Sequence, residues 1–215
     1  MFEQSDRARV FGLAPGVDFP QALCKGLIAR SEGAPPEALA RVQLIVNTAR
    51  MERRMRTLFE AGPPRLLPRI HLLTQLEGLE PAVTVPAAVS PLRRRLELIS
   101  LVARLIDRQP DLAPRSSLYD LTDSLAKLMD EMQGEGVSAQ TVFDLDVSDE
   151  SGHWQRAQAF IKIAHGFLEQ TTNAPDKEAR QRRLVLRLAE HWAVSPPDHP
   201  VILAGSTGSR GTTML

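Results

Sequence analysis

The chain has 215 residues, of which 43% are hydrophobic, and 26 Lys and Arg residues balance 26 Asp and Glu residues to a formal net charge of zero at pH 7. This length can bury a sizeable core, and the neutral balance excludes a global basic field that would attract nucleic acid. The single cysteine, Cys24, excludes a disulfide framework and a cysteine metal cluster, and its apolar neighbours predict a core residue. Because no signal region and no membrane-spanning apolar stretch is visible, we expect a cytoplasmic protein without membrane contact.

The first third of the chain alternates between short apolar runs and helical patterns. Residues 9–14 form an apolar run before Pro15 and Gly16, which predicts a buried strand that enters a tight turn. Asp18 is a suitable N-cap and Pro20 is tolerated in a first helical turn, so a helix is predicted from there to about Arg30.

Two more strands are predicted in this region. Residues 41–46 are almost continuously apolar, as in a strand of a parallel sheet that is covered on both faces. A helix is predicted over residues 49–61, with Met51, Met55, Leu58 and Phe59 on one face, and a third strand over residues 66–73. The order strand-helix-strand-helix-strand implies right-handed crossovers and a parallel sheet, and therefore an α/β fold.

Helical spacing replaces this alternation after a loop over residues 77–90. Two helices are predicted from apolar residues at intervals of three or four. The first is defined by Leu92, Leu96, Ile99, Ala103 and Ile106. The second is defined by Leu118, Leu121, Leu125, Leu128 and Met132. The second of these is expected to end at Gly134 and Gly136. Further helices are predicted over residues 154–168 and 176–193, the latter with Leu184, Leu188 and Trp192 turned inward.

A strand pattern returns at residues 200–204, followed by a glycine-rich turn over residues 205–213. Such a turn normally leads into a helix, which we do not expect in the two remaining residues, so the natural domain is expected to continue and the chain to be a fragment. We predict three parts: residues 1–76 as the first part of a nucleotide-binding-like lobe, residues 77–198 as a helical insertion, and residues 199–215 as the return to the lobe.

The first turn, residues 12–18, lies where a phosphate-binding loop would lie in such a sheet. A working loop needs the pattern Gly-x4-Gly-Lys-Ser/Thr, in which the lysine reaches the β- and γ-phosphates and the hydroxyl holds Mg²⁺. Val17 and Asp18 stand at the positions of the second glycine and the lysine, and a carboxylate there would repel phosphate. We therefore interpret this segment as an ordinary strand-to-helix turn.

The second glycine-rich turn is a near match to the same pattern. Counted from Gly205, Arg210 and Gly211 stand where a glycine and a lysine are required, while Thr212 supplies the hydroxyl. The turn could still form an anion-binding nest, for which the candidate residues are Gly205, Ser206, Thr207, Gly208, Arg210 and Thr212. A plain glycine turn without a ligand is the alternative interpretation.

Arginine is concentrated at two helices. Arg50, Arg53, Arg54 and Arg56 follow the second predicted strand at helical spacing. Arginines on such a face can neutralise the phosphates of a nucleic-acid backbone, although a solvated face with local pairing is the simpler explanation. A second run, Arg93-Arg94-Arg95, stands near a helix start, where positive charge opposes the macrodipole. Either a partner or solvent has to balance this charge, and we favour solvent.

Histidine and acidic residues form no catalytic or metal-binding motif that we recognise. The 5 histidines lack the HExxH spacing, and no Gly-x-Ser-x-Gly elbow is present. Asp144, Asp146, Asp149 and Glu150 form an acidic cluster, which we interpret as helix capping with Ser151 as the cap rather than as a Mg²⁺ site. We therefore predict no catalytic residue, metal ligand or cofactor within this chain.

Five segments, taken in order, resemble the N-terminal region of AddB proteins from alphaproteobacteria. They are residues 10–19, 91–98, 128–137, 151–155 and 205–213, and the resemblance extends over essentially the whole chain. It implies a part in DNA double-strand-break repair and recombination, since AddB pairs with an AddA-type subunit in a helicase-nuclease. It also implies a RecA-like lobe, similar to superfamily 1 helicases, with an all-helical subdomain inserted in it.

The resemblance also suggests roles for particular residues. Asn47-Thr48-Ala49 with Met55 resembles the motif that contacts single-stranded DNA in active motors, so Thr48, Arg50, Arg53 and Arg54 become candidate DNA contacts. The strand at 200–204 stands where active motors carry an Asp-Glu pair for Mg²⁺, and the matching place here reads Ala204-Gly205-Ser206. We therefore expect a part that guides DNA and docks the partner motor without hydrolysing ATP.

The cofactors of the family do not carry over to these residues. The whole complex uses ATP and Mg²⁺, and the family's C-terminal nuclease domain holds an iron-sulfur cluster through cysteines, of which this chain has only one. Two other functions stay open: an NTP-binding enzyme that uses the Gly205 turn, and a helical adaptor in which residues 91–193 dock a protein partner without binding DNA.

Overall fold

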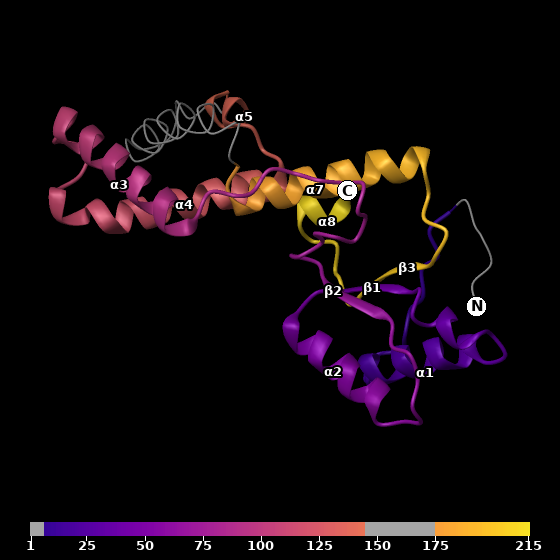
Figure 1. Cartoon of the computed structure of the whole chain (residues 1–215). Helices are drawn as coiled ribbons and strands as arrows, with labels where there is room; N and C mark the ends of the chain where they lie inside the picture. Colours follow the sequence, from indigo (N-terminus) through magenta and orange to yellow (C-terminus); the bar gives the residue numbers. More distant parts are fainter. Residues whose placement is uncertain (1–6, 145–174) are drawn as a thin grey trace. The chain divides into compact units, whose positions relative to one another are not determined.

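The computed structural model describes residues 7–144 and 175–215 (Figure 1). Over these residues the molecule combines helices with one 3-stranded parallel sheet, so the α/β class predicted from the sequence is confirmed. The chain divides into two compact units. The sheet unit runs up to Ala82 and resumes over Ala189–Ser209, whereas the helical unit extends from Val83 to Leu188 and includes Arg210–Leu215. The domain limits predicted at 76/77 and 198/199 stay a prediction.

The sheet contains β1 (Gln43–Val46), β2 (Arg69–Leu72) and β3 (Val201–Ala204), in the order β2-β1-β3. Both pairings are parallel, and Gln43 faces Arg69 on one side and Val201 on the other. All three strands lie within segments that the sequence predicted as strands. Because the strands run in the same direction, the loops that follow them leave the sheet at one common edge.

Two helices cover one face of the sheet, namely α1 (Phe19–Ser31) and α2 (Ala49–Glu60), as Figure 1 shows. The N-caps follow the sequence closely: the Asp18 carboxylate accepts a hydrogen bond from the Gln21 backbone N–H at 3.1 Å, and Thr48 Oγ1 accepts one from Met51 at 3.2 Å. A short 3₁₀ turn, η1 (Pro36–Ala38), precedes β1.

The core of the sheet unit lies between this face and the two helices. Alternate strand residues point into it because side chains in a strand alternate between faces. Its buried residues from the strands are Leu44, Val46, Ile70 and Ala204, and those from the helices are Cys24, Leu27, Met51, Met55 and Phe59. The predicted core position of Cys24 is thus confirmed, and burial raises the pKa of its thiol.

The strand predicted over residues 9–14 is wrong, because this segment pairs with no strand among the described residues. Val10 is 94% exposed and Phe11 is 61% exposed, with the Arg30 guanidinium 5.2 Å from the centre of the Phe11 ring. An apolar run becomes a strand only where a neighbouring strand can take its backbone hydrogen bonds. The predicted turn does form: Val17 N–H donates to Ala14 O at 3.3 Å, and Gly16 has a φ of 84°.

The helical unit contains α3 (Pro91–Arg108), η2 (Arg115–Ser117), α4 (Leu118–Glu135), α5 (Ala139–Phe143), the larger part of α7 (Lys177–Val194) and the short α8 (Gly211–Met214). Helices α3 and α4 pack side by side through Leu98, Val102 and Ile106 against Leu125 and Met129. These residues form a core separate from that of the sheet unit.

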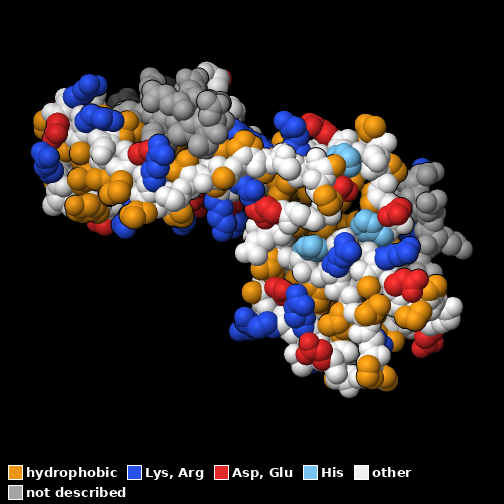
Figure 2. All heavy atoms as spheres, viewed as in Figure 1, with side chains coloured by type: hydrophobic (Ala, Val, Ile, Leu, Met, Phe, Trp, Pro, Cys, Tyr) orange, Lys and Arg blue, Asp and Glu red, His pale blue; other side chains and the backbone are white. Residues whose placement is uncertain are grey.

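The apolar stripe predicted on α3 is partly wrong. Leu92 and Leu96 are 68% and 55% exposed. Leu98 and Val102 are fully buried, although the predicted stripe did not include them. Helix α3 carries two apolar stripes, and its contact with α4 decides which one is buried. Figure 2 shows the hydrophobic side chains that remain on the surface of this unit.

The helix ends correct two further expectations. Gly136 ends α4 in the left-handed conformation with a φ of 72°, as predicted, but Gly134 lies inside the helix and is buried. A helix does follow the glycine-rich turn, namely the 4-residue α8, which we did not expect. In α7, Leu184 and Leu188 are buried as predicted and Trp192 is half-buried. The helix predicted over residues 154–168 lies outside the described residues.

None of the helices in the described part of the chain is both long and apolar enough to cross a membrane.

Candidate nucleic-acid interface

Two of the predicted site segments meet at the carboxyl edge of the sheet. Asn47 and Thr48 follow β1, and Gly205 begins the turn that follows the neighbouring strand β3. The Asn47 side-chain amide donates a hydrogen bond to the Gly205 carbonyl, 2.5 Å away, and so joins the two segments. No local pattern indicates this bond, because 158 residues separate its partners. Ligands of open parallel sheets bind outside this edge.

Thr48 has a structural role at this edge, since it caps the first turn of α2. Its Oγ1 accepts from the Met51 backbone N–H, and its backbone is extended, with φ −141° and ψ 151°. The residue is exposed, and its hydroxyl hydrogen remains available to donate to a phosphate oxygen. The position of Thr48 therefore suits both the capping role and the contact that the resemblance suggests.

The arginines of α2 fall into two pairs with different surroundings. Arg54 lies 3.2 Å from the Asp18 carboxylate and Arg56 lies 2.9 Å from the Glu52 carboxylate. The side chains of Arg50 and Arg53 are exposed and make no hydrogen bond or ion pair within the described part of the chain. Two positive charges near the start of a helix thus lack a counterion among the residues that the structure describes.

Asp18 was expected only as a cap, and it also holds one of the candidate arginines. The Gln21 backbone N–H and then the Arg54 guanidinium hold the pKa of the Asp18 carboxyl below its ordinary value. Because this ion pair is about half-exposed, its contribution to stability is small. It does direct the Arg54 guanidinium toward α1, and hence Arg54 is less available to a ligand than Arg50 and Arg53.

The candidate nest after β3 is divided between the two units. Gly205 and Gly208 adopt φ values of 71° and 64°, which favour glycine, and the Gly208 backbone N–H donates to Ser206 Oγ at 3.2 Å. Thr207 Oγ1 donates to Ser209 Oγ at 2.9 Å. These residues belong to the sheet unit, whereas Arg210 and Thr212 belong to the helical unit.

The second half of the candidate nest already has partners. The Gly211 backbone N–H donates to the Glu135 carboxylate at 2.8 Å, and the Thr212 hydroxyl donates to the Gly134 carbonyl at 2.6 Å. A carboxylate therefore occupies the place where a phosphate would have to accept this N–H. Arg210 is exposed and caps α8 without a side-chain hydrogen bond.

The residues at both glycine-rich turns do not fit ATP with Mg²⁺. At the first turn, the Asp18 carboxylate accepts the N–H group that would face a phosphate at the start of α1. At the second, Glu135 takes the corresponding N–H group of α8. Neither turn supplies the lysine that would reach the β- and γ-phosphates. We derive no catalytic step through a nucleotide.

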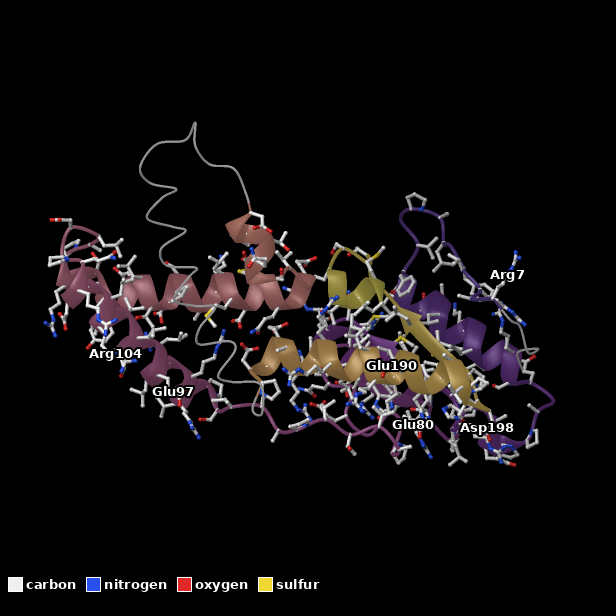
Figure 3. All side chains as sticks on the ribbon, turned by 90° about the horizontal axis from the view of Figure 1, so that it is seen from above. Arg7, Glu80, Glu97, Arg104, Glu190 and Asp198 are labelled. Atoms are coloured by element: carbon white, nitrogen blue, oxygen red, sulfur yellow. The ribbon has the colours of Figure 1, made fainter. Side chains whose placement is uncertain are left out.

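The arginines of the second run, at the start of α3, all pair with carboxylates. Arg93 pairs with Glu97 at 2.8 Å, Arg95 with Asp123 at 2.8 Å, and Arg94 with Asp130 at 2.7 Å and Asp176 at 3.3 Å. The expectation that solvent balances this run is therefore wrong. The labelled Glu97 and Arg104 both lie on α3 (Figure 3).

A polar pair that the sequence did not indicate lies on the second face of the sheet. His71 Nε2 on β2 is 2.6 Å from the side-chain oxygen of the buried Gln43 on β1. Burial, followed by the positive charge of Arg69, lowers the pKa of His71 below 6.5. The ring is therefore held mainly in its neutral form, with Nε2–H as the donor to Gln43.

Groups of three or more His, Cys, Asp or Glu side chains that could hold a metal ion are absent from residues 7–144 and 175–215. Of the acidic cluster singled out in the sequence, Asp144 is the C-cap of α5, and Asp146, Asp149, Glu150 and Ser151 lie outside the described residues.

Comparisons with known proteins returned no match to a protein-family model, to a curated protein or to a solved structure.

Proposed function

We propose that this chain is the N-terminal part of an AddB-type subunit of a helicase-nuclease that processes DNA double-strand breaks for recombinational repair. In this proposal the sheet unit belongs to a RecA-like lobe and the helical residues between β2 and β3 are its insertion. The part guides DNA and docks an AddA-type partner, and it does not hydrolyse ATP. Support comes from the parallel sheet and from the long helical segment that separates β2 from β3 in the chain.

The proposal mainly depends on Arg50 and Arg53, whose side chains have no ion-pair partner among residues 7–144 and 175–215. Both side chains are exposed near the start of α2, directly behind Thr48 and next to the Asn47–Gly205 bond. Guanidinium groups at such a place can neutralise successive phosphates of a single strand, and the N-terminus of α2 adds positive potential. The binding is local and independent of net charge, which is zero for the whole chain.

The test is the affinity of the chain for a fluorescent oligothymidylate of about 16 nucleotides, followed by anisotropy at fixed salt. We expect the double variant Arg50→Ala/Arg53→Ala to bind about tenfold more weakly than the wild type. Arg93→Ala/Arg95→Ala is the matched control, because it removes the same two charges but from guanidinium groups that Glu97 and Asp123 already hold. Equal losses in both variants would mean that only the total charge matters and would contradict the proposal.

Partner docking needs a separate test. The full chain, tagged and expressed in its native cell, should copurify with a helicase-nuclease subunit that mass spectrometry can identify by its ATPase motifs. Recovery of the chain alone, at conditions under which DNA binding is retained, would restrict the proposal to nucleic-acid binding.

A helical adaptor is the second candidate function, and one observation favours it. Leu92, Leu96 and Tyr119 expose 68%, 55% and 60% of their surface on α3 and α4. Apolar side chains that are not needed for the α3–α4 core can serve a protein partner. This candidate predicts that the double variant Leu92→Ser/Leu96→Ser no longer captures the protein partner. It also predicts that neither the wild type nor any variant binds the oligonucleotide. Salt-sensitive binding of the wild type would contradict it as the sole function.

A further inference from the structure

A carboxylate from α1 holds the one arginine of α2 that would enlarge the unpaired group. Arg54 follows Arg50 by one helical turn, so the two side chains lie on the same side of α2, with Arg53 next to them. The Arg54 guanidinium lies 3.2 Å from the carboxylate of Asp18, the N-cap of α1. Both residues belong to the sheet unit. Without this ion pair, three neighbouring guanidinium groups would be available to an anion.

The two carboxylate oxygens of Asp18 have different roles. Oδ1 accepts the Gln21 backbone N–H at 3.1 Å and caps α1, whereas Oδ2 accepts a hydrogen bond from Arg54 Nη2 at 3.2 Å. The cap requires one acceptor oxygen, and asparagine is as good an N-cap as aspartate. The ion pair with Arg54 requires the negative charge. Asparagine at this position would therefore keep the cap and release the arginine.

Asp18 lies at the edge of the sheet where the candidate site is. The ring of Phe19, the next residue, lies 3.6 Å from the place of a Cβ atom on Gly205, and Gly205 is bonded to Asn47. The side chains of Arg54 and Asp18 are 48% and 44% exposed, so an anion in solution can reach the ion pair. A phosphate that binds at the start of α2 thus meets a carboxylate that already occupies one guanidinium.

We propose that Asp18 limits the affinity of the α2 arginines for a nucleic-acid strand, because its carboxylate competes with phosphate for Arg54. The inference rests on the proposed function, since it assumes that the strand binds at Arg50 and Arg53. With the carboxylate in place the strand has two guanidinium groups to contact, and with Arg54 released it has three. Weak contacts with successive phosphates allow a protein to slide along a strand, which suits a part that guides DNA.

Anisotropy with the oligothymidylate probe tests the competition. Asp18→Asn should bind about fivefold more tightly than the wild type, and the slope of log K against log salt should be larger by about 0.7, the contribution of one more phosphate contact. An unchanged melting temperature would show that asparagine keeps the cap. Glu60→Gln is the matched control, because it removes the same charge from the exposed end of α2 without releasing an arginine, and it should change affinity by less than about twofold.

The same substitution in an Arg54→Ala background separates competition from simple repulsion. There Asp18→Asn has no guanidinium to release, so its effect on affinity should be less than about twofold. An equal gain with and without Arg54 would mean that Asp18 acts only through its charge and would overturn the competition. Wild-type or weaker affinity of Asp18→Asn in the otherwise unchanged chain would also overturn it.

The hold on Arg54 can be measured without nucleic acid. Phenylglyoxal modifies guanidinium groups, and peptide mass spectrometry gives the rate at each arginine. In the wild type, Arg54 should react about two- to fivefold more slowly than Arg50 and Arg53, and in Asp18→Asn it should react as fast as they do. Arg56, whose carboxylate partner is unchanged, should keep its wild-type rate. Equal Arg54 rates in wild type and variant would overturn the hold.

The two measurements separate this inference from the proposed function. Absence of oligonucleotide binding by both the wild type and Asp18→Asn would overturn the proposed function together with the limit on affinity, while the modification result on Arg54 would stand. Binding by the wild type with no gain in Asp18→Asn would overturn the limit on affinity alone.

Discussion

Both units of the molecule carry a helix that is rich in arginine, but the surroundings of the guanidinium groups differ. In the helical unit, the three arginines at the start of α3 all have carboxylate partners, two of them on α4. In the sheet unit, α2 has partners for Arg54 and Arg56, and its exposed Arg50 and Arg53 side chains have none within the described residues.

The difference shows why a run of like charges in a sequence does not identify a binding surface. Helix α4 presents Asp123 and Asp130 along the side that packs on α3, so the arginines there stabilise helix packing. Helix α2 packs on α1 and the sheet, and from these neighbours Asp18 is the one described residue whose carboxylate pairs with an α2 arginine. Of the four arginines on α2, Arg50 and Arg53 are therefore the ones available to phosphate.

The largest expected effect concerns the packing face of the helical unit. Leu98→Ala should lower the free energy of unfolding by about 4 kcal/mol, because Leu98 is fully buried between α3 and α4. Leu96→Ala, the control on the exposed stripe, should change it by less than about 0.5 kcal/mol. Chemical denaturation monitored by circular dichroism measures both, and similar losses would mean that the Leu92–Leu96 stripe is also covered in solution.

Removal of Arg94 should cost more stability than removal of an arginine that makes only a surface ion pair. Arg94→Ala leaves Asp176, which is 8% exposed, without its counterion, and we expect a loss of about 3 kcal/mol in the free energy of unfolding. The exposed neighbour Arg93 makes only a surface pair, so Arg93→Ala should cost less than about 1 kcal/mol. A loss of the same small size in both variants would contradict a structural role for the buried pair.

The capping role of Thr48 can be separated from its candidate DNA contact. Thr48→Ala should cost about 1 kcal/mol of stability, because the Met51 N–H loses its acceptor. Thr48→Ser keeps the hydroxyl and should restore both stability and oligonucleotide affinity. If Thr48→Ser restores the melting temperature but not the affinity, the contact with DNA requires the methyl group rather than the hydroxyl.

The smallest expected effect is a pH dependence from His71. Its pKa in the folded chain lies below the ordinary 6.5, so the unfolded chain binds more protons as the pH falls through that value. The contribution of His71 to stability is therefore fully present above about pH 7, and it declines as the pH falls below 6.5 toward the pKa of the folded state. Denaturation of the wild type and of His71→Gln should be measured from about pH 5 to about pH 8. The additional decline in the free energy of unfolding should appear only in the wild type. A parallel decline in both would assign it to other groups.

Much of the sheet unit follows from local patterns. Continuous apolar runs predicted β1 and β3, and the caps Asp18 and Thr48 predicted where α1 and α2 begin, because these signals lie within a few residues of the element. The strand expected over residues 9–14 fails because strand formation depends on a partner that the local sequence does not contain.

The remaining features depend on contacts between distant parts of the chain. The buried stripe of α3 is selected by α4, and the partners of Arg54 and Gly205, namely Asp18 and Asn47, lie 36 and 158 residues away. The sequence therefore identified the arginines as a group, and only the arrangement in space distinguishes Arg50 and Arg53 from the rest.

The salt dependence of single-stranded DNA binding tests the central claim most directly. Between about 50 and 200 mM salt, the slope of log K against log salt should be smaller by about 1.4 in Arg50→Ala/Arg53→Ala, because each phosphate contact on a single strand contributes about 0.7. Arg93→Ala/Arg95→Ala, which removes the same charge from guanidinium groups that Glu97 and Asp123 already hold, should keep the wild-type slope. Equal slopes for the two double variants, or no salt-dependent binding by the wild type, would contradict the claim that the unpaired arginines of α2 form the DNA contact.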